Sequence, residues 1–236
     1  MKINLVMIVK NEERSLKRCL EAVKPLVDRM IVVDTGSEDR TRTIAGEMGA
    51  EVYDFVWNND FSAARNFALE QSDGDWNLVL DADEYVHPCR RRELEKTLTG
   101  RKGLWLGGIL RYDFYPEEEG VSVSTSVLPR LLPGEVRYSG RIHEQPDGVY
   151  SCYQTLLKVD HDGYLYTDKG ERNLPYLLRE TEDHPEDGYY QFQLASTLRN
   201  LKRLEESLPY FRSFYRLSGK GEAYRPGGIV LYLYTL

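Results

Sequence analysis

The sequence predicts an α/β fold, in which a mostly parallel sheet is covered by helices on both faces and is followed by a small α-helical region. Short apolar runs alternate with helical patterns through the first half of the chain. The apolar runs are continuous, which is typical of strands that are buried on both faces of a parallel sheet. From about Asp168 onward, only helical spacing remains. We therefore place one domain in residues 1–165 and a helical region in residues 166–236.

The elements of the first half follow one another in strand–helix order. Strands are expected at residues 3–9, 29–34, 50–56 and 76–83, with helices at 13–23, 37–49 and 60–72. Ser37 is a candidate N-cap for the second helix and Gly49 a stop signal, because small polar residues and glycine favour these positions. The repetition predicts parallel pairing of the four strands.

The pattern changes after Glu84, where turn signals and alternation become frequent. A short helix is expected within residues 89–100, and strands at 103–115, 123–132, 136–146 and 153–164. Alternating strands of this kind predict antiparallel additions at the edge of the sheet.

The helical region shows helical spacing at residues 172–183, 187–200 and 203–218. Its last two helices can be aligned with one tetratricopeptide repeat, with Leu194, Ala195, Leu198, Ser207 and Phe211 at the pattern positions. The closing segment "GGIVLYLYTL" is very apolar. This favours docking of the segment, contacts in a homo-oligomer, or continuation into a longer array.

Composition excludes several classes of protein. The formal net charge of −7 opposes binding to a nucleic-acid backbone. The three cysteines lack the paired spacing of a zinc site or a disulfide framework. No apolar run approaches the ~20 residues that span a bilayer. Because the first predicted strand begins at residue 3, we expect no signal peptide. A cytoplasmic location is the expectation.

Polar segments follow the four predicted parallel strands, at the edge where ligands of open parallel sheets bind. They are "VKNEE" (9–13), "DTGSED" (34–39), "WNNDFSAARN" (57–66) and "DADE" (81–84). Asp81 and Asp83 are two positions apart at a strand end, so that both carboxylates can point to one side of an extended chain. Hard oxygen ligands at that spacing suit Mg²⁺ or Mn²⁺.

Other side chains can complete such a site. Asp34 can accept a hydrogen bond from an imide or a ribose hydroxyl, or can simply cap its turn. Arg65 can reach a diphosphate or orient Asp81, or can be an ordinary helix arginine. His143 and Glu144 offer a base or a metal ligand between a strand and a Pro-Asp-Gly turn.

These motifs, in this order, resemble those of the family 2 glycosyltransferases, which have the Rossmann-like GT-A fold. The resemblance runs from "LVMIVKNEERSLKRCLEAV" through "IVVDTGSEDRT", "DFSAARNFAL" and "GDWNLVLDADE" to "GRIHEQP". The continuation resembles a bacterial subgroup in which the domain is followed by tetratricopeptide-like helices. That subgroup includes enzymes that glycosylate peptides.

The resemblance implies roles for particular residues. Val9, Asn11 and Asp34 would line a uridine pocket, with Arg65 near the diphosphate. Asp81 would face ribose or metal, and Asp83 would ligate Mn²⁺ or Mg²⁺. His161 would complete the metal shell or touch the diphosphate. Many members carry their base in a Glu-Asp pair late in the domain. No clear Glu-Asp pair occupies that place here, so Glu144 is the expected base and His143 the second candidate.

The implied function is inverting transfer of a sugar from a UDP-sugar, with UDP-glucose and UDP-N-acetylglucosamine as the expected donors. The acceptor could be a saccharide, a peptide or a lipid-linked glycan, so the location includes the inner face of the membrane. Two alternatives remain. A nucleotidylyltransferase would need a glycine-rich loop, which "VKNEERS" lacks. A non-catalytic nucleotide-sugar-binding module would not need Asp34, Arg65, Asp81 and Asp83 together.

Overall fold

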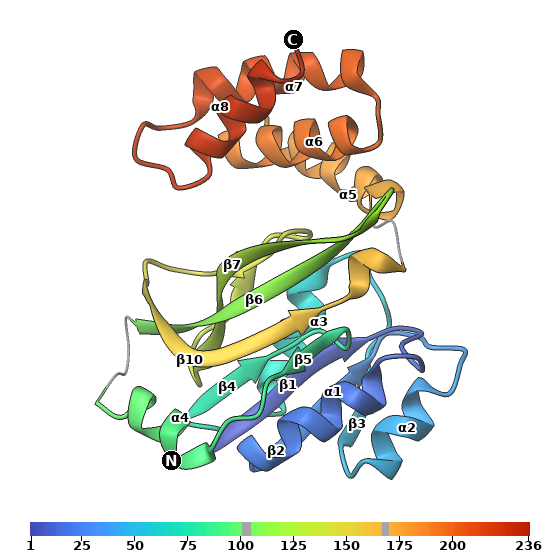
Figure 1. Cartoon of the computed structure of the whole chain (residues 1–236), viewed down its shortest axis with the longest axis vertical. Helices are drawn as coiled ribbons and strands as arrows, with labels where there is room; N and C mark the ends of the chain where they lie inside the picture. The colour runs from blue at the N-terminus through green and yellow to red at the C-terminus, as the bar shows by residue number, and fades with distance from the viewer. Residues whose placement is uncertain (101–104, 167–169) are drawn as a thin grey trace. The chain divides into compact units, whose positions relative to one another are not determined.

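The computed structural model describes residues 1–100, 105–166 and 170–236 (Figure 1). The chain divides into two compact units, Met1–Thr167 and Asp168–Leu236. The first unit contains an eight-stranded sheet with the order β3-β2-β1-β4-β7-β6-β10-β5. The second unit consists of helices in its described part.

The parallel half of the sheet confirms the predicted strand–helix repetition. Its strands are β1 (Ile3–Val9), β2 (Arg29–Asp34), β3 (Glu51–Asp54) and β4 (Trp76–Val79). The central strand β1 pairs in parallel with both β2 and β4. Val9 lies opposite Asp34 in this register, so the loops that follow β1 and β2 leave the sheet side by side.

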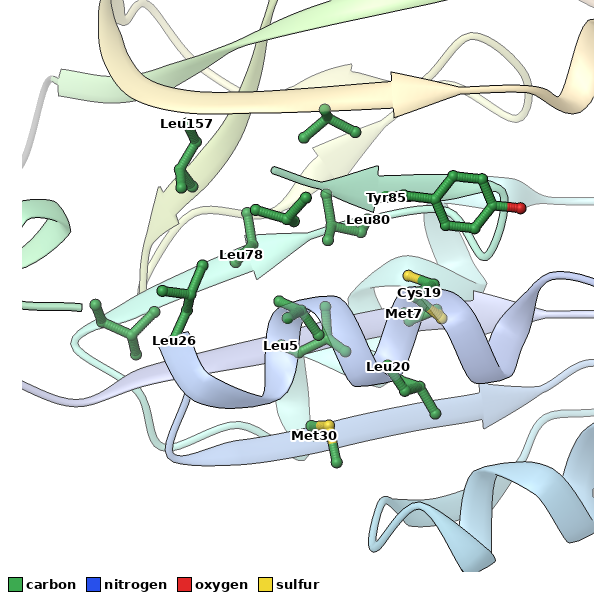
Figure 2. Packing of buried hydrophobic residues seen from close by; sticks show 14 of the residues in the cluster. Leu5, Met7, Cys19, Leu20, Leu26, Met30, Leu78, Leu80, Tyr85 and Leu157 are labelled. Atoms are coloured by element: carbon green, nitrogen blue, oxygen red, sulfur yellow. The ribbon is translucent and has the colours of Figure 1, made fainter. Parts of the chain in front are cut away.

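Helices cover both faces of the parallel half because successive side chains of each strand point to opposite faces. Leu5 and Met7 of β1 belong to a core formed with α1 (Leu16–Val23), α2 (Thr41–Glu47) and α4 (Arg91–Leu98). Figure 2 shows Leu5, Met7, Cys19 and Leu20 packed between α1 and the strands beneath it. Val6 belongs to the opposite core, which includes Ala68 and Leu69 of α3 (Phe61–Glu70).

At the edge of the sheet where the parallel strands have their carboxyl ends (the carboxyl edge), two predicted element boundaries are wrong. Ser37 does not cap α2, which begins at Thr41; the Ser37 hydroxyl instead accepts a hydrogen bond from the Asn11 N–H at 2.9 Å. The strand predicted at 76–83 ends at Val79. Asp81 then enters a turn, in which its carbonyl accepts from the Glu84 N–H at 3.1 Å.

The second half of the sheet contains β5 (Glu84–Val86), β6 (Trp105–Glu117), β7 (Gly120–Pro133) and β10 (Ser151–His161). As predicted, β7 is antiparallel to β4 and β6 is antiparallel to β7. Strand β10 instead runs parallel to β6, because the connection between them crosses back to the same end of the sheet. Residues 103–104 of the predicted strand 103–115 lie outside the described residues.

The segment 136–146 is not the single strand that its sequence suggested. It forms β8 (Tyr138–Ser139) and β9 (Gln145–Pro146), which pair with each other as a small antiparallel ribbon. The chain reverses between them through Gly140 and His143, both of which have positive φ values. This reversal forms a partly buried loop that carries His143 and Glu144.

The second unit contains α5 (Gly170–Asp183), α6 (Gly188–Asn200), α7 (Leu204–Leu217) and α8 (Arg225–Leu233). The three predicted helices are confirmed. Helices α6 and α7 pack around Ala195, Phe211 and Phe214. The apolar closing segment forms much of α8, which packs on this cluster through Ile229 and Tyr232. In the described parts of both units, no helix is long and apolar enough to cross a bilayer.

Candidate active site

The loops after β1 and β2 are joined to each other by side chains of the predicted uridine pocket. Asn11 has a φ of 55°, a conformation that asparagine tolerates better than most residues. Its side-chain oxygen accepts from the Glu38 N–H at 2.8 Å, while its own N–H donates to Ser37. Val9 ends β1 beside Asp34. The structure therefore brings Val9, Asn11 and Asp34 together.

Asp34 is buried, with 3% of its surface exposed, and its two carboxylate oxygens differ in their hydrogen bonding. Oδ1 accepts from the N–H groups of Gly36 and Ser37 at 3.0 and 2.9 Å. Oδ2 is buried and has no hydrogen-bond partner among the described residues. A buried acceptor without a partner costs about 1–3 kcal/mol. Oδ2 is therefore suited to a donor supplied by a ligand, such as an imide N–H.

Asp81 lies in the turn after β4, and two arginines bind it. Arg65 of α3 donates to Oδ1 at 2.8 Å, and Arg130 of β7 donates to Oδ2 at 2.8 Å. The Nε of Arg65 also donates to Glu144. Burial opposes the charge of Arg65, but Asp81 and Glu144 outweigh burial and raise its pKa, so that it remains a cation. Its Nη1 is buried without a hydrogen-bond partner in the described part of the chain.

Glu84 is fully buried and binds side chains of the protein. It accepts from Arg130 at 2.7 Å and from Arg111 of β6 at 3.1 Å. Its second oxygen accepts from the Asp81 N–H at 3.0 Å. Of the three acids in "DADE", Glu84 therefore fixes the turn that presents the other two.

Asp83 and His161 form the remaining pair, which joins the turn to the end of β10. The Nε2 of His161 lies 3.3 Å from Asp83 Oδ2, and its Nδ1 lies 2.7 Å from Asp113 Oδ1. Burial lowers the pKa of His161, but the hydrogen bonds to Asp113 and Asp83 outweigh burial and raise the pKa to about 9. In the ion-free protein the imidazolium thus serves as the counter-ion of Asp83.

This pKa gives a pH prediction for the ion-free protein. The folded value of about 9 lies above the ordinary 6.5, so protonation of His161 stabilises the fold fully below pH 6.5. That contribution should be lost as the pH rises through 9. An NMR titration of the four histidines should show one imidazole with a midpoint near 9, absent in His161→Gln. A His161 midpoint near 6.5 would contradict the arrangement.

Carboxylates outnumber guanidinium groups in this connected network. Its five acids are Asp81, Asp83, Glu84, Asp113 and Glu144, and its three arginines are Arg65, Arg111 and Arg130. The raised pKa of His161 makes it a fourth cation, so these acids exceed these cations by one in the ion-free protein. A concentration of carboxylates in a partly buried site favours the binding of a cation. When a divalent cation binds and His161 gives up its proton, the excess becomes two and the ion neutralises it.

The described residues contain no group of three or more His, Cys, Asp or Glu side chains that could hold a metal ion. Asp83 and His161 would therefore supply two ligands. Mg²⁺ and related ions are often held by one or two carboxylates together with water and substrate phosphates. Asp113 would orient His161 by accepting a hydrogen bond from its Nδ1, since a metal-ligating histidine usually donates its other N–H to a carboxylate. The pair fits an ion that arrives with a diphosphate.

Glu144 and His143 lie in the loop between β8 and β9, which is attached to α3. Asn66 binds the backbone of Tyr138 twice, donating to its carbonyl at 2.9 Å and accepting from its N–H at 2.8 Å. The structure places the Glu144 carboxylate against the guanidinium of Arg65. The backbone of the neighbouring His143 has a left-handed conformation, with a φ of 53°.

Sequence reasoning missed Arg111, Asp113 and Arg130 as site residues. Each is a charged residue within a strand whose neighbours are largely apolar or buried, as in "LPRLLP". That position was the available signal, because a charge in a buried strand requires a partner.

The mostly parallel sheet with helices on both faces defines an α/β domain of the GT-A type. The model of the family described as glycosyl transferase family 2 matches residues 4–122. The chain therefore belongs to glycosyl transferase family 2.

Curated relatives extend the similarity into the helical unit. A TPR repeat-containing protein of Synechococcus elongatus is 35% identical over 215 residues, which cover 83% of this chain and 52% of that protein. The glycosyltransferase SunS of Bacillus subtilis is 27% identical over 216 residues, which cover 87% of this chain and 51% of SunS. The chain thus spans about half the length of these relatives.

Among solved structures, the chain is similar to glucosyl-3-phosphoglycerate synthase from Mycobacterium tuberculosis. That crystal structure contains Mn²⁺, UDP and glucosyl-3-phosphoglycerate. The sequence identity is 24% and the TM-score 0.39, with 47% of this chain and 44% of the other chain covered.

Proposed function

We propose that the protein is an inverting glycosyltransferase that moves a sugar from a UDP-sugar to an acceptor, with Mn²⁺ or Mg²⁺ at the donor site. The observation that carries the proposal is the Asp83–His161 pair, set at the carboxyl edge of the sheet in a network whose carboxylates outnumber its arginines. Such a site attracts a divalent cation. Family membership supplies the reaction class.

The uridine would bind over the carboxyl ends of β1 and β2. Asp34 Oδ2 would accept from the imide N–H, which would satisfy its missing hydrogen bond. Val9 and Asn11 would form the walls of the pocket, because their loop is tied to the one that follows Asp34. A cytosine has no imide N–H, so UDP should bind more tightly than CDP.

The diphosphate would lie between Arg65 and the Asp83–His161 pair. The bound metal would supply Lewis-acid stabilisation of the departing UDP. Asp83 and His161 would hold that ion, while Asp81, fixed by Arg65 and Arg130, would face the ribose or the ion. Arg65 would direct its unpartnered Nη1 toward phosphate oxygens, which guanidinium groups bind well.

Inversion requires a base on the side of the anomeric carbon opposite the diphosphate. We assign Glu144 to accept the proton of the acceptor, with His143 as the second candidate in the same loop. Arg65 holds one oxygen of Glu144 and so orients the carboxylate. The acceptor would be a saccharide, a peptide or a lipid-linked glycan, and the enzyme would work in the cytoplasm, including the inner face of the membrane.

Glu144→Gln is expected to lower UDP release from UDP-glucose or UDP-N-acetylglucosamine by about 100-fold or more, the usual contribution of a general base. The glutamine oxygen can still accept from Arg65, so the dissociation constant of UDP should change little. Release would be followed with water as the acceptor and calorimetry would give the UDP affinity. Glu119→Gln, at the exposed β6–β7 turn, is the control. Unchanged release in Glu144→Gln would assign the base to another residue.

A further inference from the structure

The segment after β10 is fastened to the beginning of α1 by Asp162. Its carboxylate accepts from both terminal nitrogens of Arg14, at 3.1 and 3.3 Å, and from the Tyr85 hydroxyl at 3.1 Å. The Arg14 guanidinium also lies over the ring of Tyr166, 3.9 Å from its centre. The side chains of Arg14 and Tyr85 thus converge on the side chain that lies directly after His161, and Tyr166 covers Arg14.

The backbone of Asp162 also contacts Asp83, one of the two residues that would hold the metal. Its N–H donates to the carbonyl of Asp83 at 3.3 Å, so one residue joins the "DADE" turn to α1. Arg14 follows the loop of Asn11, which we place at the uridine pocket. Asp162 therefore connects the segment that would bind the nucleoside with the segment that would hold the metal.

Gly163 provides the space that the pair needs. A Cβ at this position would lie 2.0 Å from Asp83 Oδ2 and 2.8 Å from His161 Nε2. The φ of Gly163 is not in the left-handed region, so the backbone itself would accept alanine. The glycine is required by the approach of Asp83 rather than by its own conformation.

We propose that Asp162 is a positioning residue that couples metal binding to nucleotide binding. Gly163 makes this coupling possible because, without a Cβ, it leaves space for Asp83 to approach His161. The inference rests on the proposed function, because it needs a divalent ion between Asp83 and His161. With Arg14 and Tyr85 in place, Asp162 holds the end of β10 so that His161 Nε2 faces Asp83. Without this attachment, both ligands remain in the chain, but their mutual geometry is lost.

The coupling is measurable as the factor by which Mn²⁺ increases UDP affinity. Linkage requires that UDP increases Mn²⁺ affinity by the same factor. Mutation of residues that hydrogen-bond to metal ligands typically lowers metal affinity by about 10–100-fold. Loss of the Asp162 attachment should therefore reduce the factor by about 10-fold or more, while UDP affinity in EDTA should stay the same.

The experiment is calorimetric titration of UDP into the full chain, in Mn²⁺ and in EDTA, for the wild type and for Asp162→Asn. Asp160→Asn is the matched control, because Asp160 lies two residues before Asp162, on β10, and binds His87 at 2.8 Å instead of Arg14. Arg14→Gln removes the same attachment from the other side and leaves Asp162 unchanged. Asp162→Asn and Arg14→Gln should lose the Mn²⁺ enhancement, and Asp160→Asn should keep it.

Gly163→Ala removes no ligand and should also lose the enhancement, with thermal unfolding recorded to check the fold. Retained enhancement in Asp162→Asn and Arg14→Gln would overturn the inference while the proposed function stands. Equal losses of UDP affinity in Mn²⁺ and in EDTA would also overturn it, since they would indicate a general structural role. A wild type in which Mn²⁺ does not affect UDP binding would refute the proposed function and the inference together.

Discussion

Asp83→Ala is expected to abolish metal-dependent release of UDP from a UDP-sugar and to weaken Mn²⁺ binding by at least about 100-fold. Mutation of residues that only hydrogen-bond to metal ligands already weakens metal binding by up to about 100-fold. The reason is that Asp83 is one of the two side chains that we assign to hold the ion, and it also faces the Nε2 of His161 at 3.3 Å. Mn²⁺ binding would be followed by electron paramagnetic resonance in the presence of UDP, and release by a coupled assay.

The fold should survive this change, because Asp83 follows the buried strand β4 and its apolar neighbours stay in place. Asp75→Ala is a suitable control, since Asp75 lies immediately before β4 at the opposite end of that strand. Full activity and unchanged Mn²⁺ affinity in Asp83→Ala, with the control also active, would remove the metal assignment.

Arg65→Met should produce the largest loss of stability among the site residues. Arg65 is buried, and it binds Asp81 and Glu144 simultaneously. Methionine fills much of the volume but leaves two partly buried carboxylates facing each other. Breaking a buried pair by removing one partner costs about 3–5 kcal/mol. Chemical denaturation would measure the free energy of unfolding of the variant and the wild type.

Arg29→Met is the matched control for Arg65→Met. Arg29 also binds two carboxylates, those of Glu51 at 2.6 Å and Asp73 at 2.7 Å, but these acids are largely exposed. Exposed pairs contribute little to the free energy of unfolding because water screens them, so Arg29→Met should lose much less stability than Arg65→Met. Similar losses in the two variants would mean that burial does not govern the Arg65 contacts.

The parallel half of the fold could be predicted because β1, β2 and β4 are largely apolar runs and each of the four strands is followed by a polar loop; β3, with the sequence EVYD, is the least apolar of them. The carboxyl edge was predicted for the same reason, since parallel strands bring their following loops to one side. The end of β4 could not be predicted from this pattern. Leu80 and Ala82 continue the apolar run, and the chain turns because Glu84 accepts from the Asp81 N–H, a contact that hydrophobicity does not encode.

The partners of the acids were less predictable than the acids themselves. The sequence pointed to a metal as the counter-charge of "DADE", whereas Arg65 and Arg130 bind Asp81, and Arg111 and Arg130 bind Glu84. Arg111 and Arg130 come from β6 and β7, which meet β4 only through the tertiary register of the sheet. Asp83 is the member of the motif that faces His161.

The measurement that tests the central claim most directly is calorimetric titration of UDP into the wild-type protein, first with Mn²⁺ and then with EDTA. The account predicts binding at a single site in Mn²⁺, with an affinity that falls by about 10-fold or more when the ion is removed, because metal and diphosphate share ligands. Equal affinity in Mn²⁺ and EDTA, or no binding of UDP under either condition, would contradict it.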